Sequence, residues 1–154
     1  MPKIYSEALD RHIETDRIIG HIKGSQPGPT LIFVGGIHGN EPSGVFAIRQ
    51  VFQELEENKT IINGSIYGLA GNLWALERGE RYHKKDLNRL WTSARMKRLN
   101  ADKMEAENED EAQQIELFKI IQLILDKEKG PFYFMDLHTT SSKTMPFLTV
   151  NDSL

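Results

Sequence analysis

L-I-F-V-G-G-I-H-G-N-E-P-S-G, residues 31–44, decides the fold, because it joins a short apolar run to a glycine-rich turn and the start of a helix. The run Leu31–Val34 contains β-branched and aromatic residues without a polar interruption, which is typical of a strand buried on both faces. Among the glycines that follow stand His38 and Glu41. Pro42 suits a first helical position. An imidazole and a carboxylate are therefore expected at the carboxyl end of a buried strand, where open α/β sheets bind their ligands.

Length and composition limit the class of protein. The 154 residues correspond to one domain, long enough to bury about 70% of the surface that an unfolded chain exposes. The net charge of -3 comes without a basic block, so nucleic acid and acidic membranes are not expected as partners. There is no cysteine, so a metal would need histidine and carboxylate ligands, and the composition suits a reducing cytoplasm. Because the N-terminus lacks a signal-peptide core and no apolar run approaches the roughly 20 residues that span a bilayer, we expect a cytoplasmic protein.

The first half of the chain predicts a βαβ unit. Apolar residues at helical spacing predict a helix from Pro42 to about Asn58, and residues 65–73 predict a second apolar strand. Two strands that flank a helix imply parallel pairing with a right-handed crossover. Residues 18–22 fit a strand at the edge of the sheet, and the turn-rich segment 24–29 leads from it into the central strand.

The second half predicts another helix and further strands. Residues 100–116 are rich in Asp and Glu, and we interpret them as a mobile, solvated connection that feeds a helix start. The broad apolar face over residues 115–125 predicts that this helix packs on the sheet, and Gly130 with Pro131 ends it. Residues 132–137 then predict a third buried strand, and residues 145–150 the start of a fourth.

A charged segment lies between the two halves. Residues 74–91 show little periodicity, and a solvated loop is the simplest interpretation. Arg81, Asn88 and Arg89 change this interpretation, because guanidinium and amide groups close together on a loop can bind a carboxylate through bidentate hydrogen bonds. The remaining histidines are interpreted as surface side chains: His12, His21 and His83.

Three side chains form a candidate metal site. His38 and Glu41 are three residues apart, and His138 follows the strand predicted over residues 132–137. Two imidazoles and one carboxylate are the ligand set of a catalytic zinc site, which keeps a fourth position for water or substrate. A hydrogen-bonded helix cap would explain the first pair equally well, so the prediction depends on His138 joining them.

Three motifs follow each other through most of the chain: G-G-I-H-G-N-E at 35–41, R-Y-H-K-K-D-L-N-R at 81–89 and D-L-H-T-T at 136–140. Together they resemble the succinylglutamate desuccinylase and aspartoacylase family, a branch of the zinc carboxypeptidase-like hydrolases. The resemblance implies a three-layer α/β/α fold with a mostly parallel mixed sheet, similar to zinc-dependent exopeptidases and the phosphorylase/hydrolase-like folds. It also implies one Zn²⁺ per chain.

The resemblance assigns roles to individual residues. His38, Glu41 and His138 are implied zinc ligands, and Arg81 matches the arginine that polarises the scissile carbonyl. Asn88 and Arg89 match the pair that binds the substrate carboxylate. Asp86, by similarity to the wider carboxypeptidase group, would accept a hydrogen bond from His38 and fix its tautomer.

The implied reaction is metal-assisted hydrolysis of the amide bond in a small N-acyl amino acid. Zinc would lower the pKa of a water molecule to near 7, and a carboxylate would take its proton. Zinc and Arg81 would then stabilise the charge on the carbonyl oxygen. Two alternatives stay open: peptide hydrolysis of the metallocarboxypeptidase type, and a non-catalytic module that binds metal or carboxylate. Histidine and carboxylate also accept cobalt or manganese.

One departure from the family pattern affects the expected activity. The proton-transferring glutamate of the family follows the third zinc ligand in a strand motif that is not found before Leu154. Glu77 and Glu80 lie near Arg81, but nothing in their spacing supports them as substitutes. We therefore interpret residues 1–154 as the truncated N-terminal part of a single zinc hydrolase catalytic domain, which binds zinc with little or no turnover. An exposed parallel sheet edge is a further expectation, and it favours a homo-oligomer.

Overall fold

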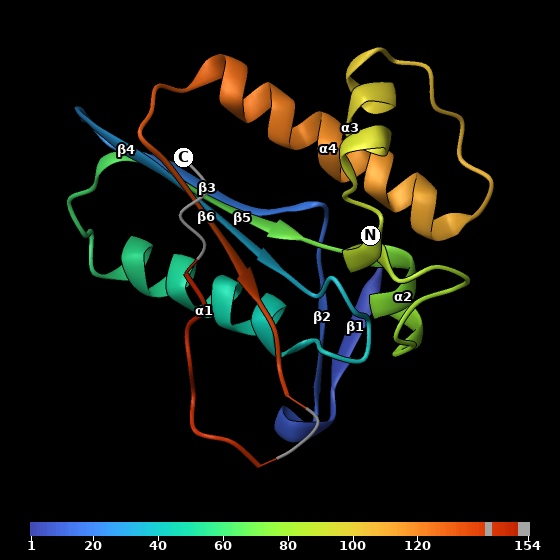
Figure 1. Cartoon of the computed structure of the whole chain (residues 1–154). Helices are drawn as coiled ribbons and strands as arrows, with labels where there is room; N and C mark the ends of the chain where they lie inside the picture. The colour runs from blue at the N-terminus through green and yellow to red at the C-terminus, as the bar shows by residue number, and fades with distance from the viewer. Residues whose placement is uncertain (141–142, 151–154) are drawn as a thin grey trace.

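The structure is a computed structural model that describes residues 1–140 and 143–150. Its main sheet has four strands in the order β3 (Ile18–Lys23), β5 (Asn63–Ala70), β4 (Gln26–Gly35) and β6 (Phe132–Leu137). β4 is parallel to both β5 and β6, whereas β3 is antiparallel to β5 (Figure 1). The predicted mixed, mostly parallel sheet with an edge strand at residues 18–22 is confirmed.

Strand β4 is the central strand that the apolar run predicts, but it begins earlier than expected. Its regular ladder with β5 runs from Thr30 to Gly35, and the pairing is irregular between Gln26 and Thr30. Pro27 and Pro29 lie in that irregular part, where their missing N–H groups cannot join a ladder. The segment predicted as a turn is therefore the irregular start of the strand.

Helices cover both faces of the sheet, which gives the three layers that were expected (Figure 1). On one face lies α1 (Ser43–Glu57), which begins one residue after Pro42 and buries Val45, Ile48 and Phe52. On the other face lies α4 (Glu109–Lys127). Because α1 connects β4 to the parallel strand β5, the predicted βαβ unit is confirmed.

The core beneath α4 joins residues that are far apart in the sequence. Apolar side chains of α4 pack with residues of β4 and β5 and of the segment after α2, and burying such side chains stabilises the fold by roughly 1.5–3 kcal/mol each. The buried members of this cluster are Ile32, Val34, Ile37, Tyr67, Leu69, Leu87, Leu90, Leu117 and Ile124. This core fixes the position of α4 relative to the carboxyl ends of the strands.

Short helices occupy the charged segment 74–91 that was interpreted as a loop, and the residues just after it. They are α2 (Leu73–Arg78), the 3-10 helix η2 (Leu87–Arg89) and α3 (Ser93–Asn100). Asn72 caps α2 by accepting a hydrogen bond from the Ala75 N–H, and Thr92 caps α3 in the same way. Helices of six and eight residues show too few turns for a clear apolar period, so only their caps signal them.

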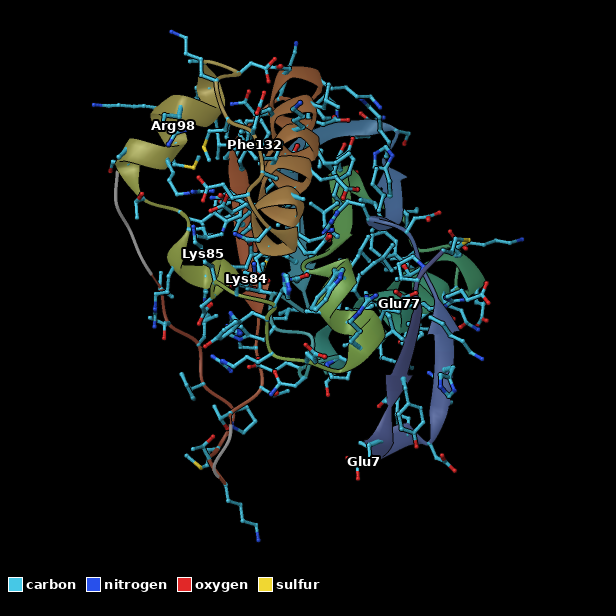
Figure 2. The ribbon with its side chains drawn as sticks, turned by 90° about the vertical axis from the view of Figure 1, so that its right-hand side faces the viewer. Glu7, Glu77, Lys84, Lys85, Arg98 and Phe132 are labelled. Atoms are coloured by element: carbon cyan, nitrogen blue, oxygen red, sulfur yellow. The ribbon has the colours of Figure 1, made fainter. Side chains whose placement is uncertain are left out.

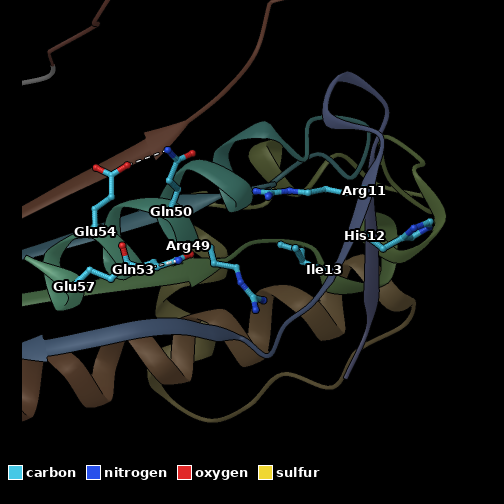
Figure 3. A pocket seen from close by; sticks show the side chains of 8 residues that line it. All are labelled: Arg11, His12, Ile13, Arg49, Gln50, Gln53, Glu54 and Glu57. Carbon is cyan, nitrogen blue, oxygen red and sulfur yellow. Dashed lines mark hydrogen bonds between the residues drawn. The ribbon is translucent and has the colours of Figure 1, made fainter.

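The N-terminal segment forms a hairpin that the sequence did not indicate. Strands β1 (Lys3–Ser6) and β2 (Arg11–Glu14) pair antiparallel around the short helix η1 (Glu7–Leu9). A polar groove between β2 and α1 is shown in Figure 3, where Gln50 is hydrogen bonded to Glu54. The residues that line this groove are Arg11, His12, Ile13, Arg49, Gln50, Gln53, Glu54 and Glu57. None of them is a predicted site residue.

The prediction of a buried strand at residues 132–137 is wrong in one respect. β6 is present, but it pairs with β4 alone among the described strands, and Phe134 is 55% exposed. Apolar composition does not distinguish a central strand from an edge strand. Residues 143–150 form no helix or strand, so the strand predicted there is also absent.

The exposed parallel edge was expected, and self-association through it stays a prediction. In the described part of the chain, no helix combines the length and apolar character needed to cross a membrane.

Gly35 tests how tightly α1 packs against the end of β4. A Cβ built there would lie 2.6 Å from the Gly44 carbonyl carbon and 2.7 Å from the Val45 nitrogen, both backbone atoms. We expect Gly35→Ala to lower the free energy of unfolding by about 1–3 kcal/mol, because the start of α1 must move. Chemical denaturation measures this change.

Gly79→Asn is the matched control for the previous prediction. Gly79 has a φ of +65° but no atom within 4 Å of an added Cβ, and Asn tolerates the left-handed conformation. Its effect should stay below about 1 kcal/mol. Equal effects of the two substitutions would contradict the close helix–strand contact.

Candidate metal centre

Three predicted ligands meet at the carboxyl ends of two neighbouring strands. His38 follows β4, His138 follows β6, and Glu41 lies just before α1. Because β4 and β6 are adjacent and parallel, their carboxyl ends reach the same edge of the sheet. One potential ligand atom from each of the three residues lies within 4.8 Å of the others. The side chains that the sequence analysis predicted as metal ligands therefore lie close together.

Local backbone geometry explains how β4 delivers His38. Gly36 adopts a φ of +74°, and a Cβ at Gly39 would lie 2.0 Å from the backbone carbon of Ala75. Glycine is needed at both positions, for the left-handed conformation and for the close approach. The N–H of Glu41 then donates to the His38 carbonyl oxygen, at 3.1 Å, which closes a turn around the two side chains.

The imidazole of His38 is held from both sides. His38 is 4% exposed, with Nδ1 at 2.9 Å from Oε1 of Glu41 and Nε2 at 3.0 Å from Oδ1 of Asp86. Burial raises the pKa of Asp86, but hydrogen bonds from His38 and the Asn88 N–H, together with the charge of Arg81, lower it overall. When a metal is bound, an ionised Asp86 would hold the proton of His38 on Nε2, which leaves Nδ1 free to act as the ligand atom.

His138 repeats this arrangement from the neighbouring strand. Its Nδ1 lies 3.0 Å from Oε2 of Glu41, and its Nε2 lies 2.7 Å from Oδ2 of Asp136. The hydrogen bond with Asp136 is the main cause that raises the pKa of His138 to about 9, against an opposing effect of burial. The sequence analysis missed Asp136, although the i, i+2 spacing to His138 is a signal for one face of a strand.

Glu41 lies between the two imidazoles and receives further donors. It is buried, and its carboxylate accepts hydrogen bonds from the Thr139 N–H at 3.0 Å and from Nη1 of Arg81 at 3.2 Å. Burial raises the pKa of Glu41, but the hydrogen bonds from Thr139, His138 and His38 lower it overall. The site therefore offers two imidazole nitrogens and one ionised carboxylate, a donor set that fits zinc.

The predicted substrate residues lie on the segment that follows α2. Arg81 has a side chain that is 49% exposed, and its Nη2 lies 3.8 Å from Oδ2 of Asp86. Nδ2 of Asn88 lies 3.4 Å from Nε2 of His138. Arg89 is exposed, and within the described ranges its guanidinium makes no hydrogen bond or ion pair. Arg81 and Asn88 thus contact the cluster directly, whereas no contact in the described part of the chain links the Arg89 side chain to it.

Two acidic residues are not solvated as expected. Asp110 and Glu111, in the first turn of α4, are buried. Nζ of Lys85 lies 2.6 Å from Oε1 of Glu111, and Arg95 also contacts this carboxylate. The prediction was wrong because an acidic run in a sequence does not reveal donors that the fold brings from another segment.

The three histidines that were interpreted as surface side chains are exposed, as predicted: His12, His21 and His83.

The fold and the cluster define an α/β protein with a candidate metal centre at the ends of adjacent parallel strands. A model of the Succinylglutamate desuccinylase/Aspartoacylase catalytic domain matches residues 27–153. The chain belongs to the succinylglutamate desuccinylase and aspartoacylase family. This finding confirms the resemblance carried by the three motifs.

Individual relatives agree with the family assignment. The chain is 28% identical over 112 residues to a succinylglutamate desuccinylase of Pseudomonas aeruginosa, which covers 73% of this chain and 31% of that protein. It is 35% identical over 75 residues to a probable aspartoacylase of Nostoc sp., covering 49% of this chain and 25% of the relative. The chain thus spans about a third or less of the length of these curated relatives.

Solved structures show the same fold. Succinylglutamate desuccinylase from Chromobacterium violaceum matches with a TM-score of 0.59 at 20% identity, over 77% of this chain and 35% of that chain. The enzyme from Vibrio parahaemolyticus matches with a TM-score of 0.60 at 18% identity, over 77% and 38%. The expected layered α/β fold with a mixed sheet is therefore confirmed.

The pKa of His138 leads to a pH-dependent prediction for the metal-free protein. Its folded pKa of about 9 exceeds the ordinary value of 6.5, so the stabilisation is fully present below pH 6.5 and is lost as the pH rises through 9. Asp136→Asn should lower the free energy of unfolding at pH 6 by about 1–2 kcal/mol, with solvent screening taken into account. The difference from the wild type should largely disappear at pH 10.

Urea denaturation at the two pH values measures this difference. Asp16→Asn, which changes an exposed aspartate before β3, is the control and should give a small effect at both pH values. A stability loss for Asp136→Asn that is the same at pH 6 and pH 10 would show that the His138–Asp136 charge pair does not contribute.

Proposed function

We propose that the chain carries the metal centre of a zinc-dependent deacylase, which hydrolyses the amide bond of a small N-acyl amino acid. The observation that carries this proposal is the convergence of His38, Glu41 and His138 within 4.8 Å. Family relatives named succinylglutamate desuccinylase and probable aspartoacylase support an acylated amino acid as the substrate class. They favour deacylation over the peptide hydrolysis considered from the sequence.

The residues around the centre suit the binding of one divalent cation. Zn²⁺ would supply a Lewis acid that activates water and the scissile carbonyl group. Asp86 and Asp136 hold the Nε2 atoms of the two imidazoles, so that both Nδ1 atoms face Glu41. Such contacts orient ligands before the metal arrives, and their loss typically weakens metal affinity 10–100-fold.

We propose that Arg81 acts on the substrate carbonyl. Its guanidinium contacts Glu41 at 3.2 Å, yet nearly half of its side-chain surface is open to solvent. A cationic donor at the edge of the centre can hydrogen bond to an oxygen that gains negative charge during attack on the acyl carbon. We assign this role to Arg81.

Asn88 and Arg89 are proposed to bind the carboxylate of the amino acid. Both belong to η2, whose first turn is fixed by the Asp86 side chain through a 2.9 Å hydrogen bond from the Asn88 N–H. A guanidinium that has no partner among the described residues can form a bidentate pair with a carboxylate at little cost in lost protein contacts. The Asp86 carboxylate thus contacts the proposed metal ligand His38 and also caps η2, the short helix that carries Asn88 and Arg89.

We expect weak or no turnover from this chain. Among the described residues, three carboxylates contact the imidazoles, those of Glu41, Asp86 and Asp136, and each lies 2.7–3.0 Å from an imidazole nitrogen. A general base must be within reach of the water and free to take its proton. We therefore propose that the proton-accepting group is none of these three.

Zinc binding tests the proposed function most simply. The wild-type chain should retain about one zinc ion after dialysis, because two imidazoles and a carboxylate are the three protein ligands that a catalytic zinc site needs. His38→Ala and His138→Ala should each lose this zinc. Metal analysis by mass spectrometry measures the content.

Two exposed histidines provide the controls for the zinc measurement. His12→Ala and His83→Ala should keep the wild-type zinc content, because these residues lie outside the cluster. The metal assignment would be abandoned if both His38→Ala and His138→Ala bound zinc like the wild type.

Carboxylate binding tests the role of Arg89. In the zinc-loaded chain, Arg89→Ala should raise the dissociation constant of N-succinylglutamate by about tenfold or more, since a charge-assisted bidentate pair is lost. Zinc affinity should not change. Isothermal titration calorimetry measures both quantities.

Arg98→Ala is the matched control, because Arg98 is an exposed arginine of α3. It should bind the ligand like the wild type. Equal affinities for Arg89→Ala and Arg98→Ala would refute the assignment of Arg89 as a carboxylate-binding residue.

A further inference from the structure

Asp110 is a buried carboxylate whose hydrogen bonds lead to the loop beside the metal centre. It is 0% exposed, and its Oδ2 accepts hydrogen bonds from the backbone N–H groups of Lys84 and Lys85, at 2.6 and 2.9 Å. Its Oδ1 accepts from the His83 N–H at 3.0 Å and from Nδ2 of Asn72 at 2.9 Å. Three consecutive backbone donors therefore converge on one side chain.

The donors belong to the segment 79–86, which we call the site loop. This loop contains Arg81 and Asp86, both of which contact the centre. It lies between α2 and η2 and forms no helix or strand, so its N–H groups have no ladder partners. Figure 2 shows Lys84 and Lys85 on this loop beside the start of α4. The first turn of α4 thus supplies the acceptor that the loop backbone lacks.

Neighbouring contacts extend this attachment on both sides. Asn72, which donates to Asp110, also caps α2 through the Ala75 N–H at 3.0 Å. Glu111 is buried next to Asp110 and contacts Nζ of Lys85 at 2.6 Å. The backbone of Lys85 is therefore bound to Asp110 while its side chain is bound to Glu111, which leaves this end of the loop little freedom.

The charge of Asp110 is important for this attachment. Burial raises the pKa of Asp110, but the backbone hydrogen bonds of the loop and the one from Asn72 lower it overall, so the carboxylate is ionised at neutral pH. An ionised carboxylate is purely an acceptor, whereas an amide of the same shape carries a donor group. Asparagine at this position would place its NH₂ group against an N–H donor on one side or the other.

We propose that Asp110 is a positioning residue, which holds the site loop so that Asp86 reaches Nε2 of His38 and Arg81 reaches Glu41. The inference rests on the proposed function, because it gives the loop its purpose at the metal centre. Asp110 touches neither the ligands nor the predicted substrate residues, and it acts through the backbone of residues 83–85. It therefore affects metal affinity through the geometry of Asp86.

The test compares zinc affinity among variants of the 154-residue chain. Asp110→Asn should raise the zinc dissociation constant by about tenfold or more, the size of effect seen when a group that orients a ligand is lost. Competition with a chelator of known affinity, well below the unfolding temperature, measures the constant. Asp110→Glu keeps the charge but moves the acceptor, and it should give a smaller increase.

Two control variants on α4 separate positioning from general stability. Asp126→Asn removes an exposed carboxylate and should leave both stability and zinc affinity unchanged. Ile124→Ala removes a buried side chain from the far end of the helix and should lower Tm without changing zinc affinity. The proposal is overturned if Asp110→Asn affects zinc affinity no more than Ile124→Ala does.

Hydrogen exchange in the metal-free protein gives an independent measurement. Asp110→Asn should speed exchange of the Lys84 and Lys85 amides, while amides within α1 keep their wild-type rates. Unchanged exchange at these two amides would refute the attachment itself. Failure of the wild type to bind zinc would instead contradict the proposed function, so the two failures can be told apart. If Asp110→Asn does not fold, Asp110→Glu serves for both measurements.

Discussion

The carboxylate of Glu41, which lies between two imidazoles from neighbouring strand ends, is the contact on which the arrangement of the site depends. It faces Nδ1 of His38 through one oxygen and Nδ1 of His138 through the other. This is possible because β4 and β6 are adjacent and parallel, although about one hundred residues separate the two histidines. Parallel pairing therefore brings together groups that the sequence keeps apart.

The rest of the centre is organised by carboxylates with different surroundings. Asp86 and Asp136 orient imidazoles, whereas Asp110 accepts backbone donors from the site loop and lies away from the ligands. A buried carboxylate is costly unless donors satisfy it, and the buried Asp110 accepts hydrogen bonds from three backbone N–H groups and from Asn72. The helix α4 consequently has two functions: its apolar face builds the core, and its first turn fixes the loop next to the site.

Patterns that depend on local spacing could be predicted from the sequence. The βαβ unit, the turn that carries His38 and Glu41, and the strand before His138 each have a short-range signature. Long-range properties could not be predicted. The exposure of Phe134 depends on which strand becomes the sheet edge, and the burial of Asp110 depends on donors from a loop about 25 residues earlier. Asp136 was overlooked because its role depends on a strand face rather than on a motif.

A crystal structure of the zinc-soaked protein, with anomalous scattering measured at the zinc edge, tests the central claim most directly. We predict one strong anomalous peak in contact with Nδ1 of His38, Nδ1 of His138 and the carboxylate of Glu41, at about 2.0–2.2 Å from each ligand atom. A strong peak at other residues, or no peak between these three side chains at saturating zinc, would contradict the account.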